Sequence, residues 1–251
     1  MDNIMSSETS ELNELISKYS PFLSEIRKRI IITLVVFAVG MVVGFVFYER
    51  IIKFLIDILA LRGVNIVFTS PFQFVNLAIS CGIATGLVFV FPLLIYQVLS
   101  FLRPALKDME YKMVVRFLPF SIILFLIGFA FGGLIMNWQI QLFLTQSVSL
   151  GIGNVLDISR LISTVLLVSV LMGIAFQFPI IILLLMRIGI ISHSSLSKYR
   201  PWVYLGSLIF AILLPPDSIL ADVLLALPLI ILFELTLILD RILERRKVVL
   251  T

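Results

Sequence analysis

Long runs of apolar residues without any charge dominate the pattern along the chain, and clusters of charged residues separate these runs. A helix needs about 20 such residues to cross the roughly 30 Å hydrocarbon core of a bilayer. The runs therefore predict six membrane-spanning helices, at about Ile30–Tyr48, Val75–Leu99, Phe117–Met136, Leu161–Met186, Pro201–Pro216 and Ile219–Leu239.

The fifth of these segments is unusually short. Its residues would extend only about 24 Å in a helix, and the turn Pro215-Pro216-Asp217 ends it abruptly. The hairpin of the fifth and sixth segments is expected either to thin the bilayer locally or to pack against neighbouring helices. We therefore predict an all-α polytopic membrane protein with six transmembrane helices, of which the fifth and sixth are short.

The composition agrees with this fold and excludes two classes of protein. Of the 251 residues, 61% are hydrophobic and only 14% are charged. A soluble domain carries about 25% charged residues, so a soluble enzyme and a disordered chain are both excluded. The single cysteine, Cys81, and the single histidine, His193, cannot build a zinc or haem site by themselves. We therefore expect no metal and no cofactor.

The basic residues are distributed unevenly between the two sets of connections. Fifteen of the 19 Lys and Arg residues precede the first helix, follow the second and fourth, or lie in the tail. The positive-inside rule then places both termini in the cytoplasm, with six crossings of the cell membrane. The net charge of +4 is thereby interpreted as topology, and no nucleic-acid partner is expected.

Two outer segments have a pattern of their own. In Glu49–Leu61, one helical face collects Ile51, Phe54, Leu55, Ile58 and Leu59. This pattern predicts an amphipathic helix that lies on the membrane or caps the bundle. Residues 137–160 mix aromatic and polar side chains and are expected at the interface as well.

Candidate polar residues precede the first membrane helix. Ser20 is a good N-cap and Pro21 suits the first helical position, so a helix is predicted to begin there. Glu25 then lies about one turn before the hydrocarbon. It either belongs to an ordinary solvated face, paired with Arg29 at i,i+4, or forms an acidic site at the interface.

The connection between the second and third helices contains Phe101, Pro104 and Glu110. An acid in the first turn of a helix is stabilised by the helix dipole, which is one explanation of Glu110. The other is a site for a guanidinium, which a carboxylate binds through two hydrogen bonds and an aromatic ring stacks against.

Two polar residues lie inside predicted membrane helices, Gln177 in the fourth and Glu234 in the sixth. Gln177 is expected to hydrogen-bond to another helix or to repair the backbone next to Pro179. Glu234 is expected to reach the interface or to pair with Arg241. Asp217 is expected to cap the sixth helix.

Together the motifs resemble the TatC family, the receptor subunit of the twin-arginine translocase, over about residues 21–241. The matching positions are Phe22-Leu23-Ser24-Glu25-Ile26-Arg27-Lys28-Arg29, Ser70-Pro71-Phe72, Tyr96-Gln97, Phe101, Pro104, Leu106, Glu110, Phe125, Gly128, Phe131, Pro215-Pro216-Asp217, Pro228 and Phe233-Glu234. In this chain Phe22 replaces the family's histidine, and Gln177 stands where many members have a membrane-embedded glutamate.

The resemblance implies a receptor for twin-arginine signal peptides at the cytoplasmic face. Glu25 and Glu110 would bind the two guanidiniums, Phe101 would stack on them, and Arg27 would orient the acids beside Pro104. The apolar part of the peptide would lie along the helices, in a concave face that contains Gln177. Expected partners are single-span subunits of the TatA and TatB type, further copies of this chain and the bilayer. Export of folded cargo would use the proton-motive force.

The expected organisation is a cytoplasmic segment at 1–20, a six-helix domain at 21–241 and a basic cytoplasmic tail at 242–251. A secondary transporter of a small solute is the alternative, although such folds usually contain internal repeats and none is visible in the sequence. A membrane protease is excluded, because it needs a Ser and a His facing each other at membrane depth. The chain is therefore not expected to be an enzyme.

Overall fold

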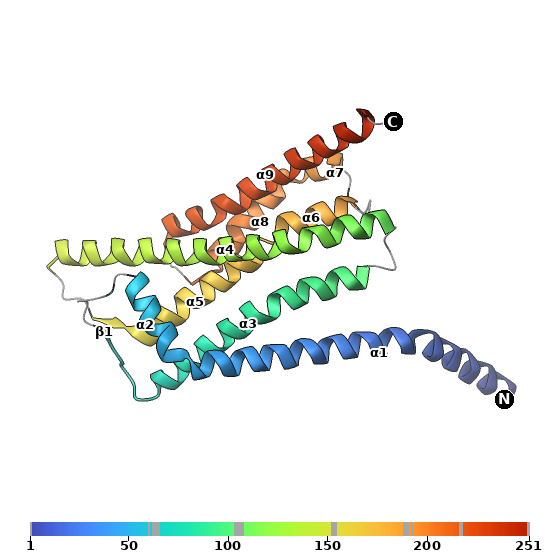
Figure 1. The fold of residues 1–251 in the computed structure, drawn as a ribbon, viewed down its shortest axis with the longest axis horizontal. Helices are drawn as coiled ribbons and strands as arrows, with labels where there is room; N and C mark the ends of the chain where they lie inside the picture. The colour runs from blue at the N-terminus through green and yellow to red at the C-terminus, as the bar shows by residue number, and fades with distance from the viewer. Residues whose placement is uncertain are drawn as a thin grey trace.

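The computed structural model describes residues 2–59, 61, 66–102, 108–151, 155–187, 191, 193–215 and 218–249 (Figure 1). These residues form nine helices and two short strands. The helices are α1 (Asp2–Val46), α2 (Tyr48–Ile58), α3 (Gln73–Leu102), α4 (Asp108–Ser149), α5 (Ile158–Ala175), α6 (Phe178–Arg187), α7 (His193–Lys198), α8 (Arg200–Ile212) and α9 (Ile219–Val249). The strands β1 (Ile66–Val67) and β2 (Leu156–Asp157) pair in parallel.

Five helical stretches in the described part of the chain are long and apolar enough to cross a membrane. They are Ser24–Val46, Gln73–Val98, Leu118–Ser149, Ile158–Met186 and Ile219–Leu239. The predicted polytopic helical fold is thereby confirmed. The fifth predicted segment corresponds to α8, whose 13 residues extend only about 20 Å. Helix α9 has 31 residues because it continues past its apolar part, which has 21.

Figure 1 shows both termini at the same end of the molecule. The last turns of α3, the first turns of α4 and helix α7 lie at that end too, whereas α2 and β1 lie at the opposite end. The helix ends next to most of the Lys and Arg residues are therefore gathered on one side, which we call the basic end. Six crossings with both termini in the cytoplasm stay a prediction.

Helices α1 and α3 approach each other so closely that only glycine fits at the crossing. A Cβ atom on Gly44 would lie 2.6 Å from the Thr85 Cβ atom and 2.7 Å from the Cys81 carbonyl oxygen. A Cβ atom on Gly40 would lie 2.9 Å from the Gly86 Cα atom. Small residues at helix crossings are a common means of association in membranes, because they let two backbones pack directly.

The centre of the bundle is built around α5, which packs against α3 and α4. Ile162 and Met172 of α5, Leu77 of α3 and Leu225 of α9 are fully buried. Gly128 of α4, one of the positions that carry the family resemblance, packs directly on Phe176: a Cβ atom on Gly128 would lie 2.6 Å from the ring. This glycine therefore serves helix packing.

The fourth predicted segment is not one continuous helix. It divides into α5 and α6 at Phe176 and Gln177. The physical reason is Pro179, which lacks a backbone N–H and clashes with the carbonyl of the residue four positions earlier. That residue is Ala175, the last of α5.

Two predicted boundaries are wrong at the ends of helices. Helix α1 begins at Asp2, so Ser20 and Pro21 lie inside it and no helix starts there. Residues 137–149, expected at the interface, continue α4 to Ser149 as a helix. In both cases polar residues extend a helix that apolar residues have already nucleated, since elongation costs much less than nucleation.

The predicted amphipathic helix is confirmed as α2, but its packed face is rotated. Ile51 and Leu55 pack on the core as expected, and Ile52 and Ile56 pack beside them. Phe54 and Ile58, expected on that face, are 63% and 51% exposed instead, whereas Leu59 is buried as expected. The reason is that α2 follows α1 after a single residue, so the end of α1 sets its rotation.

Candidate functional site

The carboxylate of Glu25 lies at the basic end and binds a guanidinium. Arg29 donates to Glu25 Oε1 from Nη2 at 2.5 Å and from Nε at 3.2 Å. The Glu25 side chain is 57% exposed and that of Arg29 is 20% exposed. The i,i+4 pairing predicted from the sequence is thereby confirmed. Both bonds end on Oε1, so the pair does not use the two-oxygen fork that a carboxylate offers to arginine.

Arg29 also connects α1 to the last turns of α3. Its Nη1 donates to the Gln97 carbonyl oxygen at 2.8 Å, and its Nη2 donates to Ser100 Oγ at 3.1 Å. One turn further along α1, the Thr33 hydroxyl lies 2.7 Å from Gln97 Oε1. This polar contact fixes the position of the Glu25 segment relative to the α3 segment that leads to Phe101.

An apolar groove runs from this polar contact along the two helices. Its volume is about 340 Å³. The groove is lined by Ile26, Arg29, Ile30, Thr33, Leu34, Leu94, Gln97 and Val98. The arrangement thus presents a carboxylate and polar groups at the basic end and aliphatic side chains toward the interior of the bundle.

The other predicted residues of this site are less completely described. Arg27 is exposed on α1, and the ion pair of Glu25 is made by Arg29 and not by Arg27. Phe101 lies in α3 and Glu110 in α4, and both their side chains are outside the described residues. Pro104 is also outside them.

Gln177 makes the interhelical hydrogen bond that its position predicts. The Ser121 hydroxyl of α4 donates to Gln177 Oε1, and Gln177 Nε2 donates to the Ser121 carbonyl oxygen at 3.2 Å. Gln177 is only 6% exposed. It therefore joins the break between α5 and α6 to α4 instead of facing an open surface.

Glu234 has partners that differ from the expected one. The Tyr204 hydroxyl donates to Glu234 Oε1 at 2.5 Å, and Arg200 Nη2 lies 3.1 Å from Glu234 Oε2. The expected pairing with Arg241 is wrong, because α8 lies against α9 and brings its own arginine nearer. The three side chains form a polar cluster that holds α8 on α9.

The outer turn is described only at Pro215, whereas Pro216 and Asp217 lie outside the described residues. A second polar cluster at that end of the molecule surrounds Asp157, which caps α5. Asp157 Oδ2 accepts hydrogen bonds from Thr69 and Gln73, each at 2.7 Å. Partial desolvation raises the pKa of Asp157, but hydrogen bonds from Thr69, Arg160, Gln73 and Ser159 together lower that pKa below 3.8.

The sequence does not indicate that Arg29, Gln97 and Ser100 form a group that joins two helices. The i,i+4 spacing indicates the Glu25–Arg29 pair, but contacts across about 70 residues of chain have no local signal. Within the described residues, no three His, Cys, Asp or Glu side chains are grouped as metal ligands.

Comparison with known proteins gives a consistent result. Residues 21–228 match the family described as Sec-independent protein translocase protein (TatC). TatCy of Bacillus subtilis (strain 168) is 30% identical over 231 residues, which cover 89% of each chain. TatC of Aquifex aeolicus (strain VF5) is 29% identical over 234 residues, which cover 90% of this chain and 95% of that protein.

Solved structures agree with the sequence relatives. A crystal structure of the twin-arginine translocase receptor TatC in DDM matches with a TM-score of 0.77 at 28% identity. The match covers 86% of this chain and 98% of that chain.

Proposed function

The chain belongs to the TatC family of Sec-independent protein translocase proteins, and from this premise we propose that it is the subunit that recognises twin-arginine signal peptides. As a member of that family it is a membrane component of a twin-arginine translocase and not a member of an enzyme family.

The observation that carries the proposal is the geometry around Glu25. This exposed carboxylate already accepts two hydrogen bonds from a guanidinium, at the basic end of an apolar groove. A twin-arginine signal peptide carries arginines followed by an apolar stretch. Such a peptide would place one guanidinium on Glu25, with the next residues of the peptide along the groove between α1 and α3.

A second carboxylate is needed for the second guanidinium, and Glu110 is our candidate. Arg29 holds the Glu25 segment against the end of α3, where its partner Ser100 directly precedes Phe101. The connection through Pro104 leads from there to Glu110. We assign Phe101 as the stacking ring and Arg27 as a second cation that orients the acids. Arg29 positions Glu25.

The apolar part of the peptide is better accommodated by the α1–α3 groove than by a face at Gln177. Gln177 is buried, and its amide is engaged by Ser121. Binding a peptide there would require this contact to break. We therefore assign Gln177 to fastening the bundle, and Glu234 to holding α8.

We further propose six crossings of the cell membrane, with both termini, the segment 1–20 and the tail 242–251 in the cytoplasm and the six-helix domain over 21–241. The grouping of both termini at the basic end supports this topology. The turn Pro215-Pro216-Asp217 would then face outward. TatA- and TatB-type single-span subunits and further copies of the chain would complete a translocase driven by the proton-motive force. Membership of the family does not favour the solute-transporter alternative.

Photocrosslinking of a twin-arginine signal peptide to the full chain in membranes tests the proposal. The crosslink should fall at least about tenfold in Glu25→Gln, since a hydrogen bond to a charged group contributes about 1.5–3 kcal/mol. Glu49→Gln is the matched control, because Glu49 is an exposed acid of α2 at the opposite end. Equal crosslinking of wild type and Glu25→Gln, or of twin-arginine and twin-lysine peptides, would reject the site.

A further inference from the structure

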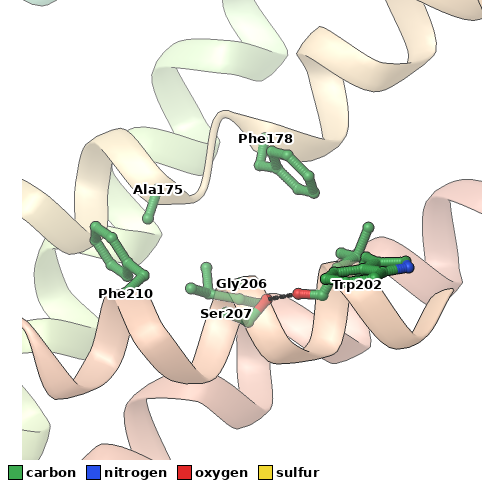
Figure 2. Close-up of a pocket in the computed structure, with 8 residues that line it drawn as sticks. Ala175, Phe178, Trp202, Gly206, Ser207 and Phe210 are labelled. Atoms are coloured by element: carbon green, nitrogen blue, oxygen red, sulfur yellow. Dashed lines mark hydrogen bonds between the residues drawn. The ribbon is translucent and has the colours of Figure 1, made fainter. Parts of the chain in front are cut away.

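A second, larger cavity opens beside α8 and is separate from the groove described above. Its volume is about 460 Å³. Figure 2 shows Ala175 and Phe178, at the break between α5 and α6, facing Trp202, Gly206 and Phe210 of α8 across an open space. Val203 and Ser207 of α8 and Leu229 of α9 complete the lining.

The lining has almost no polar groups with which an occupant could form hydrogen bonds. Seven of its eight residues are apolar, and the hydroxyl of the eighth, Ser207, already donates to the Val203 carbonyl oxygen at 2.9 Å (Figure 2). Gly206 differs from the glycines of the α1–α3 crossing, because a Cβ atom there would meet nothing within 4 Å. Its missing side chain leaves room for an occupant from outside the described residues.

The size of the cavity favours a slender chain. A helix about 10 Å in diameter fills 460 Å³ in about one turn, so the cavity cannot enclose a membrane-spanning helix of a partner. The volume lies within the range of about 300–1,000 Å³ that is usual for small-molecule sites. An acyl chain is apolar, slender and abundant around a membrane protein.

Two basic residues precede Trp202, a lining residue of the cavity, in the chain. Lys198 is exposed and ends α7 at the basic end, and Arg200 begins α8. Arg200 has five N–H donors, and its ion pair with Glu234 is made through Nη2. Trp202, next to them, is 69% exposed, as expected of an aromatic residue at a membrane interface.

We propose that this cavity binds one acyl chain of an anionic phospholipid from the leaflet at the basic end, with the phosphate of the headgroup on Lys198 and Arg200. Basic pockets between transmembrane helices are a known means of binding anionic headgroups. The proposal rests on the membrane fold and on the cavity, and it does not depend on signal-peptide recognition.

The chain provides its own two reporters, because Trp138 and Trp202 are its only tryptophans. Trp138→Phe leaves the fluorescence of Trp202 at the cavity, and Trp202→Phe leaves that of Trp138 in α4 as the matched control. The full-length variants are placed in phosphatidylcholine vesicles with small, equal fractions of brominated phosphatidylglycerol or brominated phosphatidylcholine. Bromine atoms on the acyl chains quench a nearby tryptophan.

Trp202 should be quenched with about fivefold higher apparent affinity by the anionic lipid, as expected of the charge of Lys198 alone, because Arg200 is already paired with Glu234. Trp138 should show no preference. Gly206→Leu, which fills the cavity, should remove the preference of Trp202 for the anionic lipid. Lys198→Gln should lower the ratio of the two apparent affinities toward one. Leu205→Phe, which adds volume to α8 outside the lining, should leave that ratio unchanged.

Equal quenching of Trp202 by both lipids, unchanged in Gly206→Leu, would overturn the proposal. It would also be overturned if neither lipid were preferred while a single-span partner subunit shifted the emission of Trp202. That result would assign the cavity to a side chain of the partner.

Discussion

The α1–α3 pair and the α8–α9 pair use glycine in opposite ways. In α1, Gly44 lies so close to α3 that a Cβ atom would be 2.6 Å from Thr85. In α8, Gly206 has nothing within 4 Å of the same position. Both glycines stand in apolar segments, so their surroundings in the sequence look alike. The first serves a backbone contact, and the second leaves a cavity open.

The two pairs are consequently held together by different forces. Close packing of backbones fixes α1 on α3, and the contact of Arg29 with Gln97 and Ser100 completes it at the basic end. Helix α8 is attached to α9 by Tyr204 and Arg200 around Glu234. We infer that the α1–α3 pair is the more rigid support and therefore suits a recognition site.

The largest expected effect comes from filling the α1–α3 crossing. Gly44→Leu should destabilise the protein by about 3 kcal/mol, because overpacking a tight contact forces the backbones apart. Gly206→Leu should change the stability by less than about 1 kcal/mol, since the new side chain enters open space. Thermal unfolding of both variants in the same detergent measures the difference. Equal melting temperatures would remove the contrast between the two glycines.

A smaller effect is expected at the polar attachment of α8. Glu234→Ala leaves Arg200 and Tyr204 without their shared carboxylate and should cost about 1–2 kcal/mol. The loss should be local, so hydrogen exchange should increase in α8 and stay unchanged in α1. Glu49→Ala, at an exposed acid of α2, is the control. Faster exchange throughout the molecule would contradict a local role of the cluster.

The buried contact between α4 and the α5–α6 break is expected to contribute less. Ser121→Ala removes the hydroxyl that donates to Gln177 and should cost about 0.6 kcal/mol, the average for hydrogen bonds between membrane helices. Thr145→Val removes another hydroxyl of α4, whose bond stays within that helix, and is the matched control. A loss no greater than that of the control would show that Gln177 does not fasten the bundle.

The smallest effect concerns acid stability at the opposite end of the molecule. The folded-state pKa of Asp157 is lowered below 3.8, so its stabilising contribution is complete above about pH 3.8 and disappears as the pH falls through the folded-state pKa. Asp157→Asn keeps a capping side chain but does not titrate. Wild type should therefore lose more stability than this variant between pH 5 and pH 3. Parallel curves of stability against pH for the two proteins would contradict the lowered pKa of Asp157.

The apolar runs were sufficient to predict the membrane helices, because crossing a bilayer imposes a length and a composition. The fifth segment was predicted to be short because the turn at Pro215 and Pro216 ends it. Helix α8, with 13 residues, confirms this. Pro179 explains the break at Gln177, but it could not have been predicted from the proline alone, since Pro92, Pro119 and Pro228 lie inside continuous helices. The early start of α1 could not be predicted, since Ser20 and Pro21 favour the start of a helix and yet lie inside α1.

In the candidate site, the i,i+4 spacing was sufficient to predict the Glu25–Arg29 pair, but not the contacts of Arg29 with Gln97 and Ser100. Arg200 was missed as the partner of Glu234, because the alignment of α8 with α9 depends on tertiary packing. The cavity beside Gly206 was missed for the same reason. The positions of the side chains of Phe101 and Glu110 stay predictions.

A double-mutant cycle between Glu25 and the arginines of a twin-arginine peptide tests the central claim most directly. The dissociation constant of a twin-arginine peptide is measured for wild type and Glu25→Gln in lipid nanodiscs, with each peptide arginine in turn replaced by lysine. If Glu25 binds one guanidinium, replacing that arginine should weaken binding at least about tenfold in wild type and much less in Glu25→Gln, with a coupling above about 1.5 kcal/mol. Additive effects for both arginines, within about 0.5 kcal/mol, would contradict the assignment of Glu25.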